Sequence, residues 1–162
     1  MRETVFRYQI ADYLNVGTDT EKYALMGVGF NTLDENPSAQ TDGKTYISEK
    51  SQTSQIKSYQ TQFPFNTDLI ASEEAAMALY DVGRNQKTGA GAEKGYVRVE
   101  LFKPVEASEN TFEARKFKVA VEVSGIAGAG GETVVVSGNL NGVGDFIEGT
   151  FNTTTKTFTP AV

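Results

Sequence analysis

Three pairs of neighbouring carboxylates are the side chains in this sequence that most resemble an acid–base site. The pairs are Asp34 with Glu35, Glu73 with Glu74, and Asp145 with Glu148. Two carboxylates can supply the acid and the base for glycoside cleavage. Sugar clefts also need aromatic platforms, however, and the chain contains no Trp. Nothing distinguishes the pairs from solvated surface charge, so we predict that the protein is not an enzyme and has no catalytic residues.

Histidine and cysteine are both absent from the sequence. Their absence removes the commonest general base, the commonest metal ligand and the thiolate nucleophile, and it excludes disulfides. A set of oxygen-bearing side chains has the chemistry to hold calcium, but its spacing is not that of a known calcium loop, and a hairpin turn explains it better. The set is Asn139, Asn141, Asp145 and Glu148. We expect no metal ligands.

A glycine-rich segment at residues 125–131, GIAGAGG, is the closest approach to a phosphate-binding loop. It lacks the GxGxxG spacing and precedes a strand pattern, whereas a phosphate loop must open a helix. Gly89-Ala90-Gly91 fails for the same reason. Both segments are predicted to be plain loops, and we expect no cofactor and no small-molecule substrate.

The net charge of -6 and the isoelectric point near 4.7 disfavour specific nucleic-acid binding, which relies on clustered Lys and Arg. No apolar run reaches membrane-spanning length, and the first residues do not resemble a secretion signal. We expect a soluble protein without membrane partners, made in the cytoplasm. At 162 residues the chain is predicted to form a single domain over residues 1–162.

Alternation of apolar and polar residues predicts the elements that must carry any functional surface. Strands are expected at residues 10–16, 23–30, 95–102, 112–123, 133–140 and 143–151. Asp42-Gly43 and Asn141-Gly142 have the composition of tight hairpin turns, and the second would join the last two strands. The fold class is therefore predicted to be mainly β, an antiparallel sandwich or partial barrel.

One helix is expected over residues 69–82, closed by Gly83 and packed on the sheet. Glu73 and Glu74 complement the positive end of its dipole. The face predicted to pack on the sheet consists of Leu69, Ala76, Met77 and Tyr80.

Two segments allow different interpretations. Within the long polar loop at about residues 34–55, the linker at residues 49–55 is either a mobile surface loop or an arm that becomes ordered against another subunit. The N-terminal arm at about residues 1–9 is either a frayed end or a subunit contact. Its apolar residues Val5, Phe6 and Tyr8 favour a contact, because aromatic side chains seldom lie on a free tail uncovered.

The order of the segments resembles that of the major tail tube proteins of phages with long tails, especially siphophages. The stretches that carry the resemblance are IADYLNVGTDTEKYALMGVGF, KTYISEK, QIKSYQTQFPF and LIASEEAAMALYDVG, followed by a β-rich second half. Together they span most of residues 10–123. The resemblance lies in order and local composition, without an invariant catalytic motif.

This resemblance implies a structural virion protein that forms hexameric rings, stacked into a hollow tube through which DNA passes. Residues of the polar loop would contact the adjacent ring: Asp34, Glu35, Asp42, Lys44, Glu49 and Lys50. Lys118, Glu122 and Glu100 would face the lumen. Six copies at -6 each would carry about -36, so the wall would let DNA pass without holding it.

The implied partners are other copies of the chain, a tape-measure protein, and tail-terminator or tail-tip proteins, and the implied location is the tail of a virion assembled in a bacterial host. An alternative is the inner tube of a contractile tail or of a phage-like bacteriocin, which shares the fold and carries a sheath. A weaker alternative from another class is a glycan-binding β-sandwich module, which the lack of Trp disfavours.

Overall fold

The computed structural model describes residues 2–161, which form eleven strands and one α-helix, with two short 3-10 helices. The helices are η1 (Arg7–Gln9), α1 (Glu74–Arg84) and η2 (Gly89–Ala92). The strands are β1 (Ile10–Asn15), β2 (Tyr23–Leu25), β3 (Phe30–Leu33), β4 (Ala39–Lys44), β5 (Thr53–Tyr59), β6 (Gln62–Asp68), β7 (Glu93–Pro104), β8 (Thr111–Ala127), β9 (Val135–Gly142), β10 (Ile147–Asn152) and β11 (Thr157–Pro160).

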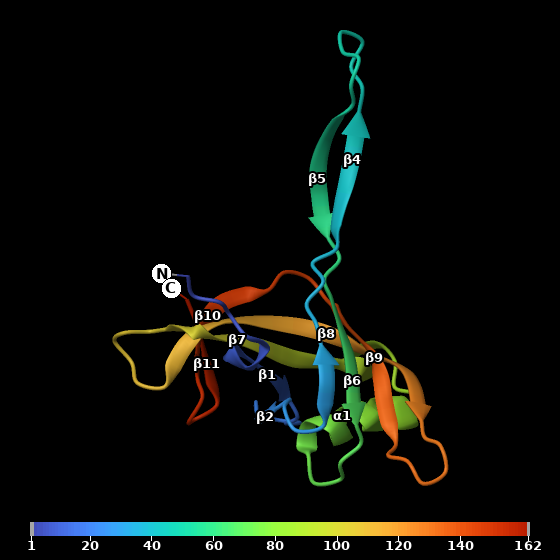
Figure 1. Cartoon of the computed structure of the whole chain (residues 1–162), viewed down its shortest axis with the longest axis vertical. Helices are drawn as coiled ribbons and strands as arrows, with labels where there is room; N and C mark the ends of the chain where they lie inside the picture. Colours follow the sequence, from blue (N-terminus) through green and yellow to red (C-terminus); the bar gives the residue numbers. More distant parts are fainter. Residues whose placement is uncertain (1, 162) are drawn as a thin grey trace.

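Nine of the strands form one antiparallel sheet in the order β2-β1-β7-β8-β9-β6-β3, with β10 and β11 branching from β8. The sheet curls but does not close, because β2 and β3 both lie at its ends and do not pair with each other. Helix α1 packs against the curled half of the sheet (Figure 1). The expected fold class, mainly β with one helix packed on an antiparallel sandwich, is confirmed. No helix within residues 2–161 is long and apolar enough to cross a membrane.

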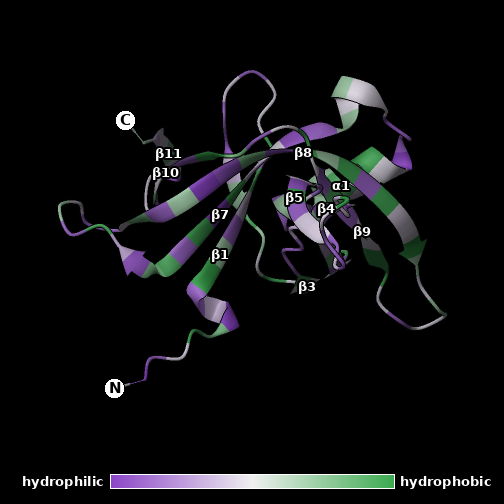
Figure 2. Ribbon diagram, turned by 90° about the horizontal axis from the view of Figure 1, so that it is seen from above, coloured by the Kyte–Doolittle hydropathy of each residue, from purple (hydrophilic) through white to green (hydrophobic). Residues whose placement is uncertain are grey.

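Two hydrophobic cores lie on opposite faces of the central strands. The first core lies between the curled sheet and α1 and includes Leu14, Phe63, Tyr96, Val119 and Leu140. The second lies under β10 and β11 and includes Tyr13, Val97, Val99, Phe151 and Phe158. Because successive residues of a strand point to opposite faces, the neighbours Tyr96 and Val97 enter different cores. Figure 2 shows the resulting mixture of hydrophobic and hydrophilic positions along β1, β7 and β8.

The helix begins later than its sequence pattern indicates. It starts at Glu74, after a turn in which the Leu69 amide donates to the carbonyl of Val134 in the approach to β9. Leu69 therefore lies outside the helix, although its side chain packs against the first core. This tertiary hydrogen bond holds residue 69 in an extended path that local helix propensity does not predict.

Gly83 lies inside α1 instead of ending it. The helix continues to Arg84 and is followed by Asn85, whose amide bonds the carbonyl of Asp81. A Cβ at position 83 would come 2.7 Å from Cγ1 of Val123 on β8. The glycine is thus explained by close packing of the helix on the sheet, and the prediction that it ends the helix is wrong.

Two predicted strand boundaries also change. Residues 23–30 form β2 and β3 rather than one strand, because the chain turns at Gly27–Phe30, where Gly29 has a φ of +92°. Asp42-Gly43 lies within β4 and is not a turn. The β4–β5 turn falls in residues 45–52 instead.

The predicted terminal hairpin does not form. Strands β9 and β10 both pair with β8, β9 along residues 119–127 and β10 along residues 111–116. The two strands therefore lie end to end along one edge of this 17-residue strand and cannot pair with each other. Asn141 and Gly142 belong to the end of β9, and β10 pairs with β11 on its other side.

Most of the predicted polar loop is a two-stranded hairpin that projects from the body (Figure 1). Strands β4 and β5 pair only with each other, and every residue in them is exposed. At the base, the Asn36 amide donates to the Gln62 carbonyl at 2.8 Å, and the Gln62 amide returns the bond at 2.9 Å. This bridge joins the hairpin to the main sheet.

Candidate functional site

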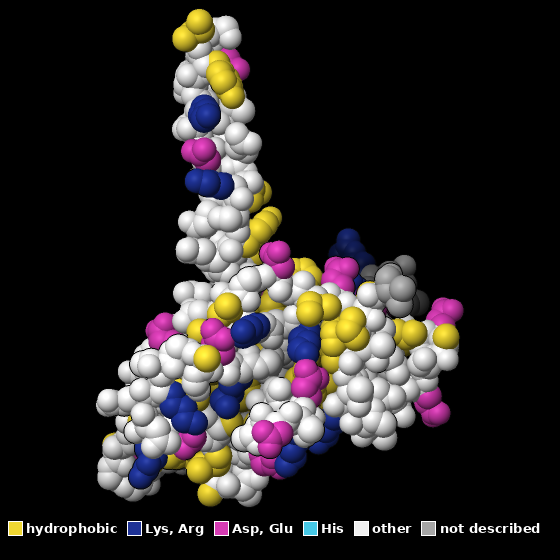
Figure 3. All heavy atoms as spheres, turned by 180° about the vertical axis from the view of Figure 1, so that it is seen from behind, with side chains coloured by type: hydrophobic (Ala, Val, Ile, Leu, Met, Phe, Trp, Pro, Cys, Tyr) yellow, Lys and Arg dark blue, Asp and Glu magenta, His cyan; other side chains and the backbone are white. Residues whose placement is uncertain are grey.

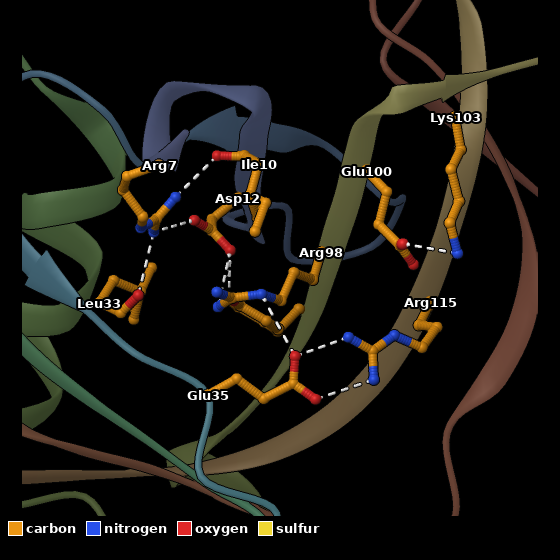
Figure 4. A network of polar contacts seen from close by, with 10 residues as sticks. Arg7, Ile10, Asp12, Leu33, Glu35, Arg98, Glu100, Lys103 and Arg115 are labelled. Atoms are coloured by element: carbon orange, nitrogen blue, oxygen red, sulfur yellow. Dashed lines mark hydrogen bonds and ion pairs between the residues drawn. The ribbon is translucent and has the colours of Figure 1, made fainter. Parts of the chain in front are cut away.

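A chain of ion pairs lies where the hairpin and the N-terminal segment meet the sheet (Figure 4). Its members come from η1, β1, the segment after β3, β7 and β8. They are Arg7, Asp12, Glu35, Arg98 and Arg115. We call this set the anchor network.

Glu35 connects the anchor network to the hairpin. Both of its oxygens accept hydrogen bonds from the Arg115 guanidinium, at 2.8 and 2.6 Å, and one also lies 3.4 Å from Nε of Arg98. The hydrogen bond to Glu35 raises the pKa of Arg115. Glu35 immediately precedes Asn36, so the ion pair and the Asn36–Gln62 bridge together fix the base of the hairpin.

Asp12 is the buried centre of the anchor network. Its carboxylate accepts hydrogen bonds from the Tyr96 hydroxyl and from Nη1 of Arg98, the latter at 3.3 Å. Burial of the ring, followed by the negative charge of Asp12, raises the pKa of Tyr96 well above its usual value. A buried carboxylate needs such partners, because an unpaired charge in the interior is strongly destabilising.

Arg7 ties the N-terminal segment into the same network. Its guanidinium donates to Asp12 at 2.7 Å, to the carbonyl of Ile10 at 2.7 Å and to the carbonyl of Leu33 at 3.0 Å. On either side of Arg7 the predicted arm residues Val5, Phe6 and Tyr8 are exposed, and the Phe6 and Tyr8 rings stack with centroids 5.9 Å apart. An aromatic surface thus extends from an anchored arginine.

The hairpin carries exposed apolar side chains along its length (Figure 3). Tyr46 and Ile47 lie at its tip, and Ile56 and Tyr59 lie on β5. Residues 39–59 contain three Lys, one Asp and one Glu, a net charge of +1, which leaves -7 on the rest of the chain. The hairpin is therefore an apolar and slightly basic projection on an acidic body.

Four of the six predicted loop residues lie on this projection, and the other two lie before its base. Asp34 is exposed just after β3, and Glu35 is held in the anchor network. Asp42 and Lys44 are exposed on β4. Near the tip, Lys50 is exposed and Glu49 accepts a hydrogen bond from the Thr53 hydroxyl at 2.9 Å.

Two of the three predicted lumen residues share a face of the sheet. Lys118 and Glu122 lie on the same side of β8, where Lys118 pairs with Glu93 at 3.0 Å. Glu122 accepts hydrogen bonds from the Asn139 and Asn141 amides of β9, at 3.3 and 3.1 Å. These bonds, chiefly the one from Asn141, lower the pKa of Glu122. The surface is polar and exposed at these positions.

Glu100 belongs to the opposite face. Glu100 lies directly opposite Glu113 of β8, so the two side chains share a face of the sheet. Glu113 is an odd number of residues from Lys118 on the same strand, so their side chains point to opposite faces. The Glu100 carboxylate pairs with Lys103 at 3.1 Å. The structure therefore does not bring Glu100 together with Lys118 and Glu122.

The buried face of α1 consists of Ala75, Ala76, Leu79 and Val82. Of the four residues predicted for this face, Ala76 is fully buried, Tyr80 and Leu69 pack at the edge of the first core, and Met77 is half-buried. Leu69 lies outside the observed helix, and the spacing of residues 75, 79 and 82 defines the side of the helix that is buried.

Sequence reasoning missed the anchor network except for Glu35. A signal in the sequence could have indicated this network, namely a charged residue on the core-facing side of an apolar strand. Asp12 in IADYL and Arg98 in YVRVE are such residues. Within residues 2–161 no group of acidic side chains is arranged to hold a metal ion.

No protein-family model matches the chain, and the curated proteins contain no significant match to its sequence. Solved structures do resemble it. A chain of the sheath/tube terminator of the extracellular contractile injection system PVC, in the extended state, superposes with a TM-score of 0.58 at 8% identity. The match covers 91% of this chain and 97% of that one.

Two further structures show the same similarity. A chain of the PVC sheath–tube complex in the extended state matches with a TM-score of 0.54 and 10% identity, covering 90% of each chain. A chain of the anti-feeding prophage (AFP) baseplate matches with a TM-score of 0.50 and 6% identity, covering 91% of this chain and 97% of that one. At such low identity the comparisons establish a shared fold.

Proposed function

We propose that this protein is a structural tube subunit of a phage tail or a related injection particle, which assembles as hexameric rings stacked around a hollow lumen. The observation that carries the proposal is the projecting β4–β5 hairpin, exposed at every strand residue, on a fold shared over nine-tenths of the chain with components of sheath–tube assemblies. The anchor network holds this projection in place while leaving its surface free.

An isolated two-stranded hairpin is at best marginally stable in water. The β4–β5 hairpin also exposes Tyr46, Ile47, Ile56 and Tyr59, which a monomer leaves uncovered. Burial of these side chains against another copy would stabilise the hairpin and supply much of the driving force for association. The proposal therefore assigns the hairpin to contacts between rings.

The ends of the open sheet offer a second type of contact. β2 and β3 each pair on one side only, and β11 pairs only with β10. Unpaired strand edges favour pairing with another chain unless they are covered. Neighbours within a ring would cover such edges, and a head-to-tail contact of this kind closes into a ring when its rotation fits.

The polar face of β8 and β9 suits a lumen wall. Lys118 pairs with Glu93, and Glu122 is held by two asparagine amides, so these charges are balanced or hydrogen-bonded. The net charge of -6 disfavours DNA binding, which relies on an excess of Lys and Arg. In the proposal, DNA passes along this face without being held.

The inner tube of a contractile particle is the favoured form, because the similar solved structures come from contractile injection systems. In that form a sheath surrounds the tube. The remaining proposed partners are a tape-measure protein within the lumen and terminator or tip proteins at the ends. A terminator ring is the second candidate, favoured by the highest of the three TM-scores, 0.58. A terminator would form single rings, whereas a tube protein stacks.

Negative-stain electron microscopy of the concentrated full chain tests this proposal. We expect hollow rings or tubes with sixfold end views. Single rings that never stack would favour the terminator. A protein that stays monomeric at high concentration, at both low and high salt, would contradict the proposal, and sugar-dependent stabilisation of that monomer would point to the glycan-binding alternative.

A further inference from the structure

A groove of about 760 Å³ lies between β1 and β3, where the curled sheet fails to close. Its apolar lining comes from several strands and their connections and includes Ile10, Leu25, Met26, Phe30, Leu101 and Phe112. Leu25 is exposed at its edge. The groove is thus an apolar hollow on the surface at the margin of both cores, since Met26 and Phe30 belong to the edge of the first and Leu101 and Phe112 pack against the second.

The groove exists because two strand edges face it without pairing. β2 covers β1 only along residues 13–15, so the carbonyl of Ile10 remains on an open edge. At the end of β3, the amide of Asp34 donates to the carbonyl of Pro64 in β6. The carbonyl of Leu33 belongs to the same peptide group and points the opposite way, so it points away from β6. Arg7 donates to both open carbonyls.

The bridge formed by Arg7 leaves the groove accessible. The Arg7 side chain is half exposed, and it spans the gap with a single guanidinium instead of a hydrogen-bonded strand. The edge carbonyls are satisfied, while Leu25 stays exposed beside them and Ile10, Leu101 and Phe112 are only partly buried. The surface is therefore suited to an apolar occupant that contributes side chains.

The hairpin tip has the complementary composition. Ile47 is fully exposed and Tyr46 is more than half exposed. The tip lies far from the body of its own chain, so it cannot reach its own groove (Figure 1). Any groove that it fills must belong to another copy.

Charge also favours this pairing. Lys44 and Lys50 flank the tip, whereas the groove lining includes the exposed carboxylate of Asp34. The cation in the lining, Arg7, already pairs with the buried carboxylate of Asp12, which leaves the charge of Asp34 available. Opposite charges around an apolar contact favour the correct orientation and speed association. The hairpin carries +1 and the remainder of the chain carries -7, so the attraction extends beyond this one contact.

We infer that the β1–β3 groove is the acceptor for the hairpin tip of a second copy, with Tyr46 and Ile47 seated on its apolar lining. This inference rests on the proposed assembly and specifies its contact residues. It assigns the groove to a copy of this chain instead of a small molecule or the N-terminal arm.

Disulfide trapping tests the assignment, because the chain has no cysteine of its own. The full-length single variants Ile47→Cys and Thr32→Cys, the second lining the groove, are mixed, assembled and oxidised. In the matched control, Ile47→Cys is mixed with the variant Thr155→Cys, whose cysteine lies at an exposed position in the β10–β11 turn. Disulfides form only when the two Cα atoms approach within about 7 Å, so we expect the 47–32 dimer to exceed the 47–155 dimer at least about tenfold.

Assembly of the unaltered chain is scored separately by microscopy, which distinguishes the two proposals. Rings or tubes without a preferential 47–32 dimer would overturn the groove assignment and leave the tube function standing. Preferential coupling of Thr32→Cys to Phe6→Cys would assign the groove to the N-terminal arm and also overturn it. If the unaltered chain forms neither rings nor tubes, the tube function fails and the groove assignment fails with it.

Discussion

The Glu35 carboxylate accepts two hydrogen bonds from the Arg115 guanidinium, at 2.8 and 2.6 Å, and so fastens the base of the projecting hairpin to the longest strand of the sheet. Both side chains are largely shielded from water. Bidentate, charge-assisted pairs between an arginine and a carboxylate are among the stronger polar contacts in proteins. The hairpin therefore projects from a fixed base and does not act as a free loop.

Replacing Glu35 with Gln is expected to destabilise the fold. The change leaves Arg115 and Arg98 without their shared carboxylate, and the free energy of unfolding should fall by about 1–3 kcal/mol. Urea denaturation measures this change. Glu100→Gln is the matched control, since Glu100 pairs with the half-exposed Lys103 and its loss should cost less than about 1 kcal/mol. Equal effects of the two variants would show that Glu35 has no special anchoring role.

Replacing Asp12 with Asn keeps the shape of the side chain and removes the central charge of the anchor network. Arg98 is buried and would lose its closest carboxylate, so we expect a loss of about 3–5 kcal/mol. Thermal and chemical unfolding both report this loss. Asp42→Asn, at an exposed position on β4, serves as the control and should leave stability unchanged. A tolerated Asp12→Asn would refute the central role of this carboxylate.

Gly83→Ala tests the contact between α1 and β8. Alanine favours an isolated helix by about 1 kcal/mol over glycine. Here its Cβ would meet Val123 at 2.7 Å, and the overpacking is expected to outweigh that gain, with a net loss of about 1–3 kcal/mol.

The double variant Gly83→Ala/Val123→Ala should recover part of the loss relative to the two single changes. Gly130→Ala is the control, because a Cβ there meets nothing within 4 Å. Additive effects of the two single changes would mean that the clash with Val123 is not the cause.

The pKa of Glu122 provides a test of the polar sheet face. The hydrogen bonds from Asn141 and Asn139 hold the pKa of this carboxyl below its ordinary value of 4.5. A carboxyl whose pKa is depressed by folding adds stability above its unfolded pKa, and that stability is lost as the pH falls through the folded pKa. The stability contributed by Glu122 should therefore decline below about pH 4.5.

Carbon-detected NMR titration measures this pKa directly. Asn141→Ala should raise the pKa of Glu122 toward its ordinary value, with a smaller rise for Asn139→Ala. Gln62→Ala removes a neighbour that bonds Asn141 but not Glu122, and it is the matched control. An unchanged Glu122 titration in Asn141→Ala would contradict the assigned cause.

The paired substitution Tyr46→Ser/Ile47→Ser separates assembly from folding. Both side chains are exposed in the monomer, so the midpoint of thermal unfolding should stay within a few degrees, while rings or tubes should be lost because the apolar contact is removed. Electron microscopy and sedimentation measure the assembly. Ser51→Ala, also exposed near the tip, is the control and should assemble normally. Normal tubes from the double variant would exclude the tip as a contact.

Local patterns located most of the strands. Alternation along the stretches that became β1, β7 and β8 identified them because each has core positions at a period of two. The pairing of the strands was harder to predict. β9 and β10 both pair with the same edge of β8 instead of with each other, and no local turn signal indicates this. For the same reason, Asp42-Gly43 was predicted to be a turn although it lies within β4, and Gly83 was predicted to end the helix although it lies within α1.

Composition and short-range periodicity were sufficient to predict a mainly β chain with one helix, a negative net charge and no histidine or cysteine chemistry. The tertiary structure, in contrast, makes the polar segment a projecting hairpin through the pairing of β4 with β5. It also brought Arg7, Asp12, Glu35, Arg98 and Arg115 into one network. Asp12 and Arg98 are 86 residues apart in sequence, and their contact depends on strand register, which is set by the packing of the whole sheet.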